Sequence, residues 1–332
     1  MLYKLKQFIK GLIWEKYLPC YVLNRNPMIV FAYDRDFTSR KSEFLREFAG
    51  HSSIHLFLML GWQHETAKMA EPFAKELTEA MQELSALSIT VLANSPEEVE
   101  SLTRLGIRTI LCQQNAFIDE RKYPIIKKEK IYDAIYIARI TPFKRHYLAE
   151  KVSSLRLIGD FYESERPYVD KTLADLKHAA YTRQVKSSRI PDEISKAKCG
   201  LCLSCEEGAM FVSAEYLLCG IPIVETANLG GRNTIYPPFA YKEVPDTPEA
   251  VAEAVGEYAK SRPEPQAIRQ AVIENMQKYR EILRSELNEI LKEHGKPPFQ
   301  GRFPHKLGLR ITRMPWVSWK YGLKARSKKA SA

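Results

Sequence analysis

Two glutamates, Glu207 and Glu215, lie in the most informative stretch of the sequence, residues 198–231. A short apolar run there is followed by an acidic turn, by apolar residues at helical spacing and by a second apolar run. Strand, helix and strand within about thirty residues predict a βαβ unit with parallel strands. The turn would place Glu207 and Gly208 beside a helix N-terminus, where N–H groups favour an anionic ligand. With two carboxylates to accept hydroxyl hydrogen bonds, the pattern predicts a nucleotide-sugar site.

This stretch resembles the donor-binding signature of retaining GT-B glycosyltransferases of family four. The resemblance is carried by Ser204, Glu207, Gly208, Glu215, the segment 219–222 and the pair Gly230 and Gly231. The alternative is an ordinary buried βαβ unit whose glutamates are solvated.

A second element begins at Asp133, where a predicted strand ends in the cation Arg139 and Lys144 follows. A departing diphosphate gains negative charge as a glycosidic bond breaks, and two fixed cations can stabilise that charge in place of a metal. The element resembles the family's Gly-Arg-(x4)-Lys sequence, with Ala138 where glycine is usual. The alternative is a solvated basic loop.

The resemblance implies a role for each of these residues. Arg139 and Lys144 would contact the diphosphate, Glu207 the sugar hydroxyls and Glu215 the ribose hydroxyls. Ser204, Gly208, Gly230 and Gly231 would complete the donor site. No cofactor or metal would be obligatory, and the substrate would be a nucleotide-diphosphate sugar.

The function implied is transfer of a sugar, with retention of configuration, to a glycan or lipid-linked acceptor in surface polysaccharide or glycoconjugate synthesis. Two alternatives stay open. One is a nucleotide-sugar 2-epimerase on the same fold, and the other is a non-catalytic scaffold that binds glycan or membrane.

Strands and helices alternate from Met28 onward, and 332 residues suit two domains. The expected fold class is α/β, with two Rossmann-like doubly wound domains facing a cleft (GT-B) and a short N-terminal domain. We expect an N-terminal acceptor-side domain over 1–125, a nucleotide-sugar-binding domain over 126–300 and a basic aromatic tail over 301–332. A linker is expected near 123–130.

Acceptor-side candidates are His64 and Asp36, the second from the sequence Asp34-Arg35-Asp36. This D-x-D falls too early in the chain for the metal-binding pair of the other major glycosyltransferase fold. Cys199, Cys202 and Cys205 have a metal-like spacing, but a strand would point them to different faces, so we interpret them as small buried residues. Six cysteines in a chain of this size indicate a reducing compartment.

The net charge of +10 is concentrated in the tail: residues 301–332 hold nine Lys or Arg and no Asp or Glu. Tryptophans interleave with these cations, which favours an anionic membrane surface. Residues 1–18 have the pattern of a basic amphipathic helix, which could lie on a membrane or pack on the protein. No nucleic-acid module is visible, so nucleic acid is not an expected partner. We expect a cytoplasmic protein, which could attach peripherally to the cytoplasmic face of a membrane.

Overall fold

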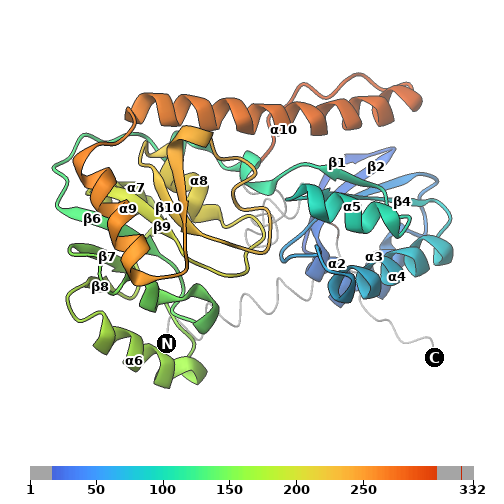
Figure 1. Cartoon of the computed structure of the whole chain (residues 1–332). Coiled ribbons are helices and arrows are strands. Elements are labelled where there is room, and N and C mark those ends of the chain that lie inside the picture. Colours follow the sequence, from blue (N-terminus) through green and yellow to red (C-terminus); the bar gives the residue numbers. More distant parts are fainter. Residues whose placement is uncertain (1–16, 305–322, 324–332) are drawn as a thin grey trace, which may run out of the picture. The chain divides into compact units, whose positions relative to one another are not determined.

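The computed structural model describes residues 17–304 and Leu323, and these residues form two compact units. The first unit contains the chain up to Phe117 and again from Tyr279 onward, and the second is Ile118–Lys278 (Figure 1). The domain limits 1–125, 126–300 and 301–332 stay a prediction. Almost all of the predicted amphipathic helix 1–18 and of the basic tail lies outside the described residues.

The first unit is built on a five-stranded sheet in the order β1-β2-β3-β4-β5. Its strands are β1 (Cys20–Arg25), β2 (Met28–Tyr33), β3 (Ile54–Met59), β4 (Leu87–Ala93) and β5 (Thr109–Leu111). Strands β2 to β5 are parallel, and β1 pairs antiparallel with β2. The alternation of strands and helices expected from Met28 onward is present, whereas β1 lies before Met28 and was not expected.

Four helices follow the strands of this sheet. They are α2 (Asp34–Ser39), α3 (Lys41–Phe48), α4 (Ala67–Glu83) and α5 (Pro96–Arg104). The start of α5 follows from local sequence, because the Ser95 side chain accepts a hydrogen bond from Glu98 N at 3.1 Å and Pro96 opens the helix.

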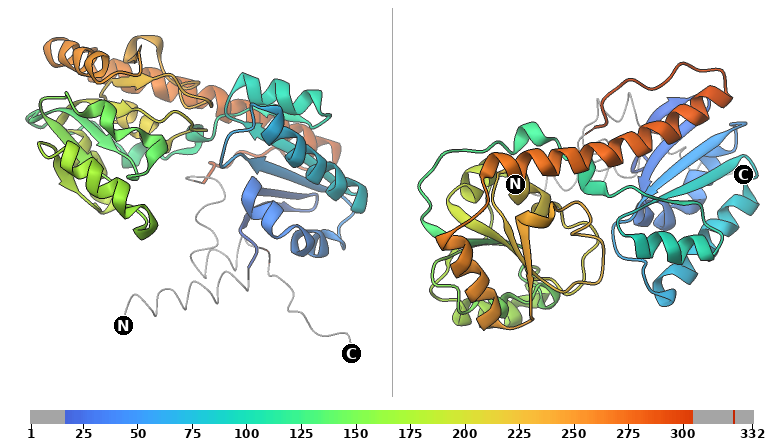
Figure 2. Two further views of the ribbon diagram at one scale, coloured as in Figure 1. Left: turned by 60° about the horizontal axis from the view of Figure 1, so that its bottom comes forward. Right: turned by 45° about the horizontal axis from the view of Figure 1, so that its top comes forward.

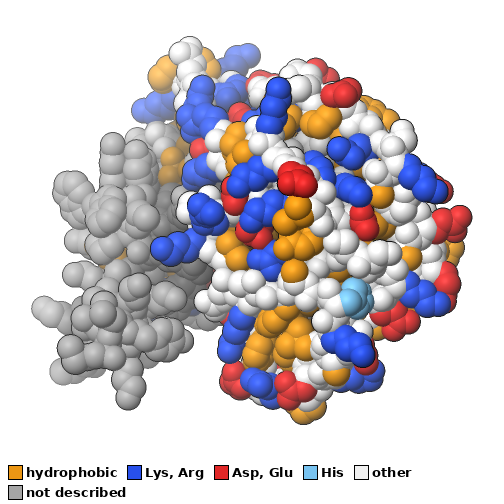
Figure 3. Space-filling view, turned by 90° about the vertical axis from the view of Figure 1, so that its left-hand side faces the viewer, with side chains coloured by type: hydrophobic (Ala, Val, Ile, Leu, Met, Phe, Trp, Pro, Cys, Tyr) orange, Lys and Arg blue, Asp and Glu red, His pale blue; other side chains and the backbone are white. Residues whose placement is uncertain are grey.

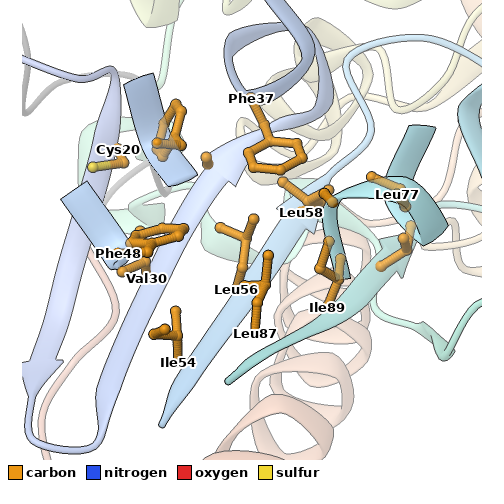
Figure 4. Close-up of a cluster of buried hydrophobic side chains, with 14 of the residues drawn as sticks. Cys20, Val30, Phe37, Phe48, Ile54, Leu56, Leu58, Leu77, Leu87 and Ile89 are labelled. Atoms are coloured by element: carbon orange, nitrogen blue, oxygen red, sulfur yellow. The ribbon is translucent and has the colours of Figure 1, made fainter. Parts of the chain in front are cut away.

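The core of the first unit lies between one face of the sheet and helices α2, α3 and α4. Figure 4 shows Leu56, Leu58 and Ile89 of the strands pointing toward Phe37 and Leu77 of the helices, and all of these side chains are buried. Alternate residues of the same strands, such as Phe31 and Phe57, are buried on the opposite face.

The later chain returns to complete this unit. Helix α10 (Pro265–Glu293) continues past Tyr279 into it. His294, just after the helix, packs its ring edge-on against His55 of β3, with centroids 5.6 Å apart. Leu323 O accepts a hydrogen bond from Leu18 N at 2.9 Å, and the Leu323 side chain joins the buried cluster.

The second unit contains a six-stranded, fully parallel sheet in the order β11-β10-β9-β6-β7-β8 (Figures 1 and 2). Its strands are β6 (Tyr132–Ile137), β7 (Leu155–Ile158), β8 (Ala180–Thr182), β9 (Ala197–Cys202), β10 (Ile223–Thr226) and β11 (Tyr241–Val244). Its helices are α6 (Arg166–Asp175), α7 (Ile190–Ile194), α8 (Phe211–Leu218), α9 (Pro248–Lys260) and the first part of α10.

The strand order of the second sheet reverses between β6 and β9. This reversal makes the sheet doubly wound, and ligands of such sheets bind outside the carboxyl ends of the strands at the reversal. The parallel strands of the first sheet follow one another in sequence order instead. The reversal therefore directs attention to the loops after β6 and β9.

Charged side chains of both signs are interspersed over the face shown in Figure 3. Helix α6 carries two exposed ion pairs, in which Lys171 pairs with Asp175 at 2.6 Å and Arg166 with Asp170 at 3.0 Å. Within residues 17–304 and at Leu323, no helix combines the length and apolar character that crossing a membrane requires.

Gly200→Ala should destabilise the protein. A Cβ at this position of β9 would lie 2.2 Å from the Tyr216 ring, which is fully buried and whose hydroxyl accepts a hydrogen bond from Ile137 N at 2.8 Å. We expect a loss of about 1–3 kcal/mol in the free energy of unfolding, measured by urea denaturation.

The matched control is Gly256→Ala in α9, where a Cβ meets nothing within 4 Å. This change should leave the protein as stable or raise its stability by about 0.5–1 kcal/mol, because alanine is favoured over glycine inside a helix. Equal stability of the two variants would contradict the close packing of Gly200 on Tyr216.

Candidate functional site

Three loops meet at the carboxyl ends of the neighbouring strands β10, β9 and β6. They contact one another through the backbone: Cys205 N donates to Phe143 O at 3.1 Å, Glu207 N to Leu229 O at 2.9 Å and Leu229 N to Cys205 O at 2.8 Å. The loops after β6 and β9 flank the point where the strand order reverses. All the donor-site residues predicted from the sequence lie in these loops or in helix α8.

The Lys144 and Glu207 side chains form an ion pair that joins the loop after β6 to the loop after β9. Lys144 is only 8% exposed, and Glu207 is half-buried. Arg139 is exposed instead, and its guanidinium carbon lies 4.5 Å from the centre of the Tyr162 ring. The structure thus brings Lys144 and Glu207 together, whereas Arg139 stacks on an aromatic ring.

The backbone around Gly230 sets the position of the turn that carries Glu207 and Gly208. Gly230 has a φ of +125°, and a Cβ there would lie 2.0 Å from Glu207 O. Only glycine fits both this conformation and this close approach. The Asn228 side-chain amide donates to Gly230 O at 2.9 Å and to Glu207 O at 3.3 Å, which fixes the two segments further.

Helix α8 begins later than the sequence suggested. Met210 has a left-handed φ of 48°, and the helix starts only at Phe211. Ala209 and Met210 therefore separate Gly208 from the first helical turn. The prediction that Glu207 and Gly208 lie directly beside the helix N-terminus is corrected to this extent, because the chain first turns at Met210.

Arg232 and Glu225 form a buried ion pair that the sequence analysis missed. The Arg232 Nε to Glu225 Oε2 distance is 2.9 Å, and the two side chains are each 1% exposed. Arg232 also donates to Ser204 O at 2.9 Å and to Thr226 O. Burial raises the pKa of Glu225, and the neighbouring guanidinium opposes that rise. One side chain thus ties the ends of β9 and β10 together.

Arg145 and His146 are built into the fold, so the segment around Lys144 is not a solvated basic loop. Arg145, with a left-handed φ of 50°, donates to Leu203 O at 2.7 Å and to Thr226 Oγ1 at 2.6 Å. His146 is fully buried with its ring 4.8 Å from that of Tyr136, and burial, reinforced by Lys144, lowers its pKa to about 3. Tyr136 OH in turn donates to Lys144 O.

Glu215 lies apart from the Lys144–Glu207 pair, on helix α8. It is 8% exposed, and its Oε1 accepts a hydrogen bond from Tyr123 OH at 2.7 Å. Tyr123 is itself buried, although it falls in the segment expected to be a linker. Sequence spacing gives no signal for this partner, since the two residues are 92 positions apart.

The Ser204 hydroxyl is buried and forms no hydrogen bond with any described residue. A buried hydroxyl without a partner is costly, and a site that hydrogen-bonds an anion would satisfy it. Together the three loops offer a cation, carboxylates and a hydroxyl at the edge where such sheets bind ligands. Within the described part of the chain, no group of three or more His, Cys, Asp or Glu side chains could hold a metal ion.

The acceptor-side candidates lie in the first unit. His64 Nε2 is 4.0 Å from Asp34 Oδ2, and both side chains line a pocket of about 260 Å³. Asp36, the residue chosen from the sequence, does not line this pocket. Asp34 is the first residue of α2 and is 4% exposed, which the D-x-D pattern alone could not indicate.

The sequence matches no family model and no curated protein. Solved structures are similar to it. HepE (Alr3699) of Anabaena in complex with UDP is 15% identical, with a TM-score of 0.59 over 79% of this chain and 78% of that chain. A glycosyltransferase from Rickettsia africae is 12% identical, with a TM-score of 0.56 over 78% and 81%. Sucrose-phosphate synthase from Thermosynechococcus elongatus is 14% identical, with a TM-score of 0.55 over 78% and 77%.

The fold is that of GT-B glycosyltransferases. At these identities the likeness concerns the fold alone. The expected α/β class with Rossmann-like sheets is confirmed.

Arg232→Met should destabilise the protein strongly. Removing the guanidinium leaves the Glu225 carboxylate buried without its partner, which costs about 3–5 kcal/mol in the free energy of unfolding. The double variant Arg232→Met, Glu225→Met should lose less, because no isolated charge remains. Both are measured by urea denaturation.

Lys171→Met, which breaks an exposed pair with Asp175 on α6, is the matched control and should leave the unfolding midpoint essentially unchanged. If Arg232→Met behaved like this control, the buried pair would not hold the loops together.

Proposed function

We propose that this chain is a retaining glycosyltransferase of family four. It would move a sugar from a nucleoside diphosphate to a glycan or lipid-linked acceptor in the synthesis of surface polysaccharide or glycoconjugates. The proposal assigns the donor to the region 126–300 and the acceptor to the region 1–125. The observation that carries it is the Lys144–Glu207 ion pair, which spans the two loops at the reversal of the second sheet.

The proposed chemistry depends on charge. A diphosphate leaving group becomes more negative as the glycosidic bond breaks, and cations fixed beforehand lower the energy of that transition state. The Lys144 ammonium has three hydrogen-bond donors, so it can serve Glu207 and a phosphate oxygen together. Arg139, exposed at the end of β6, is the second proposed cation, and Ser204 is a proposed hydrogen-bond partner of the phosphates.

The two glutamates have distinct proposed roles. Glu207, in the turn held by Gly230, would accept hydrogen bonds from the transferred sugar. Glu215, on α8, would accept them from the ribose, and the hydrogen bond from Tyr123 OH to its Oε1 would hold the carboxylate in one orientation. HepE has been solved with UDP and with UDP-glucose, so uridine diphosphate sugars are the first donors to test.

Product analysis separates the proposed function from its alternatives. Transfer with retention should give a product with the same anomeric configuration as the donor, which NMR spectroscopy reports. Formation of the 2-epimer of the donor would favour an epimerase. Nucleotide binding without any turnover would favour a non-catalytic scaffold.

Glu207→Gln and Glu215→Gln should differ in what they impair. Glu207→Gln should reduce transfer on the order of 100-fold, because its proposed partner is part of the transition state. It should not weaken the binding of free UDP, because the variant no longer neutralises Lys144. Glu215→Gln should weaken UDP binding by about 1–2 kcal/mol, since its proposed partner is the ribose. Calorimetry measures UDP binding, and a radiolabelled-sugar assay measures transfer.

Glu206→Gln is the matched control for charge, one position away in the same turn. It should leave both measurements near wild type. Wild-type behaviour of Glu207→Gln and Glu215→Gln in both assays would remove these loops from the donor site, and the family assignment with them.

We also propose that the basic tail attaches the protein to the cytoplasmic face of an anionic membrane. Changing Lys324, Arg326, Lys328 and Lys329 to Gln should weaken binding to vesicles containing phosphatidylserine more than tenfold. Each cation near such a surface contributes about 1 kcal/mol, and added salt should reproduce the effect by screening. Flotation with the vesicles measures the bound fraction.

Charge changes are preferable to deletion here, because a deletion through Leu323 would also remove a core side chain of the first unit. The control changes the same number of exposed cations in the second unit to Gln: Arg166, Lys171, Lys177 and Lys186. Equal loss of binding in the two variants would show that net charge matters and the tail does not.

A further inference from the structure

The pocket beside His64 has the chemistry of a binding site in its own right. It lies in the first unit, next to the loops that follow β2 and β3, at the edge where parallel sheets bind ligands. Its volume of about 260 Å³ is just below the roughly 300 Å³ at which drug-sized sites begin, so it suits a single ring.

Asp34 is held rigidly at the pocket. Its Oδ1 accepts hydrogen bonds from Arg35 N at 2.7 Å and Gly61 N at 3.0 Å. Residue 61 has little room for a side chain, because a Cβ there would lie 3.1 Å from the same oxygen. The other oxygen, Oδ2, is the one nearest the His64 ring.

His64 is held as firmly. Its backbone N–H donates to the buried carboxylate of Glu98 at 3.1 Å, and its ring lies 4.5 Å from that of Phe73. The 4.0 Å between His64 Nε2 and Asp34 Oδ2 is too long for a direct hydrogen bond. A hydroxyl group between the two atoms could donate to the carboxylate and also bond to the imidazole.

The rest of the lining selects among ligands. Trp62 and Phe73 provide aromatic surface. Glu76 adds a second carboxylate to that of Asp34, and Arg35 is the one Lys or Arg among the lining residues. Lys41 lies 3.8 Å from Glu76 and offsets its charge, so the buried carboxylate of Asp34 is the group that most disfavours a phosphate or a carboxylate ligand. Aromatic surface with hydrogen-bond acceptors suits a ring that has apolar C–H faces and hydroxyl groups at its edge.

We propose that this pocket binds a neutral sugar ring, with one hydroxyl between Asp34 and His64. This inference rests on the proposed function and narrows its acceptor: the group bound here is an uncharged sugar, not the phosphate of a lipid carrier. Asp34 and Trp62 join His64 as residues that determine which acceptor is accepted.

The test is direct binding to the full chain, measured by saturation-transfer NMR titration. The probes are methyl glycosides of glucose, galactose, mannose and N-acetylglucosamine, with methyl glucuronide and glucose 6-phosphate as charged counterparts. At least one neutral glycoside should bind, and the charged probes should bind at least tenfold more weakly. Equal or tighter binding of the charged probes would overturn the proposal, and so would the absence of binding by every neutral glycoside.

Variants assign the binding to the pocket. Asp34→Asn and His64→Gln should each weaken the binding of the best neutral glycoside about tenfold, while Glu71→Gln, on the exposed side of α4 and outside the pocket, should not. UDP affinity and the unfolding midpoint are measured in parallel and should stay at wild-type values. Unchanged glycoside binding in both pocket variants would overturn the proposal even where their folds are intact.

The same measurements separate failure of this proposal from failure of the proposed function. Sugar binding at the pocket without UDP binding or transfer would support the proposed sugar pocket but refute the glycosyltransferase assignment. Transfer from UDP-sugars that is insensitive to Asp34→Asn and His64→Gln would support the glycosyltransferase assignment but refute the proposed sugar pocket.

Discussion

The candidate site depends on one buried ion pair. Arg232 and Glu225 lie under the loops at the carboxyl ends of β9 and β10, and the guanidinium also binds two backbone carbonyls. A buried charge in such a place is costly without its partner, so this pair holds the starts of both loops at a fixed separation. Arg232 holds the Ser204 carbonyl directly, and the loop that continues from Ser204 carries Glu207 of the Lys144–Glu207 pair.

The parts of this fold that the sequence could predict were those with a local signal. The βαβ pattern around Glu207 and the helix start at Ser95 are read from neighbouring residues, and the structure has both. Strand β1 was missed because Cys20–Arg25 shows no regular alternation, and its place at the edge of the sheet comes from pairing with β2. Its antiparallel direction depends on that pairing too.

The candidate site was predictable as a set of residues but not as a geometry. Lys144 and Glu207 were both selected, yet their contact joins residues 63 positions apart. Arg232 follows directly after the glycine pair, and nothing in its neighbours marks it as a buried cation. Asp34 was passed over for Asp36, because burial, which distinguishes the two, depends on how α2 meets the sheet. Long-range packing therefore decided each of these cases.

The way the first unit is assembled has a consequence for protein synthesis. Residues 17–117 leave the ribosome first, but Leu323 and the part of α10 beyond Tyr279 emerge only after the whole second unit. The second unit is continuous in sequence, so it can fold as soon as it has been made. Until then Leu18 and the buried cluster that Leu323 joins are incompletely covered, so the first unit presents apolar surface to chaperones and to other nascent chains. The half of the protein that is made first is thus the last to be finished.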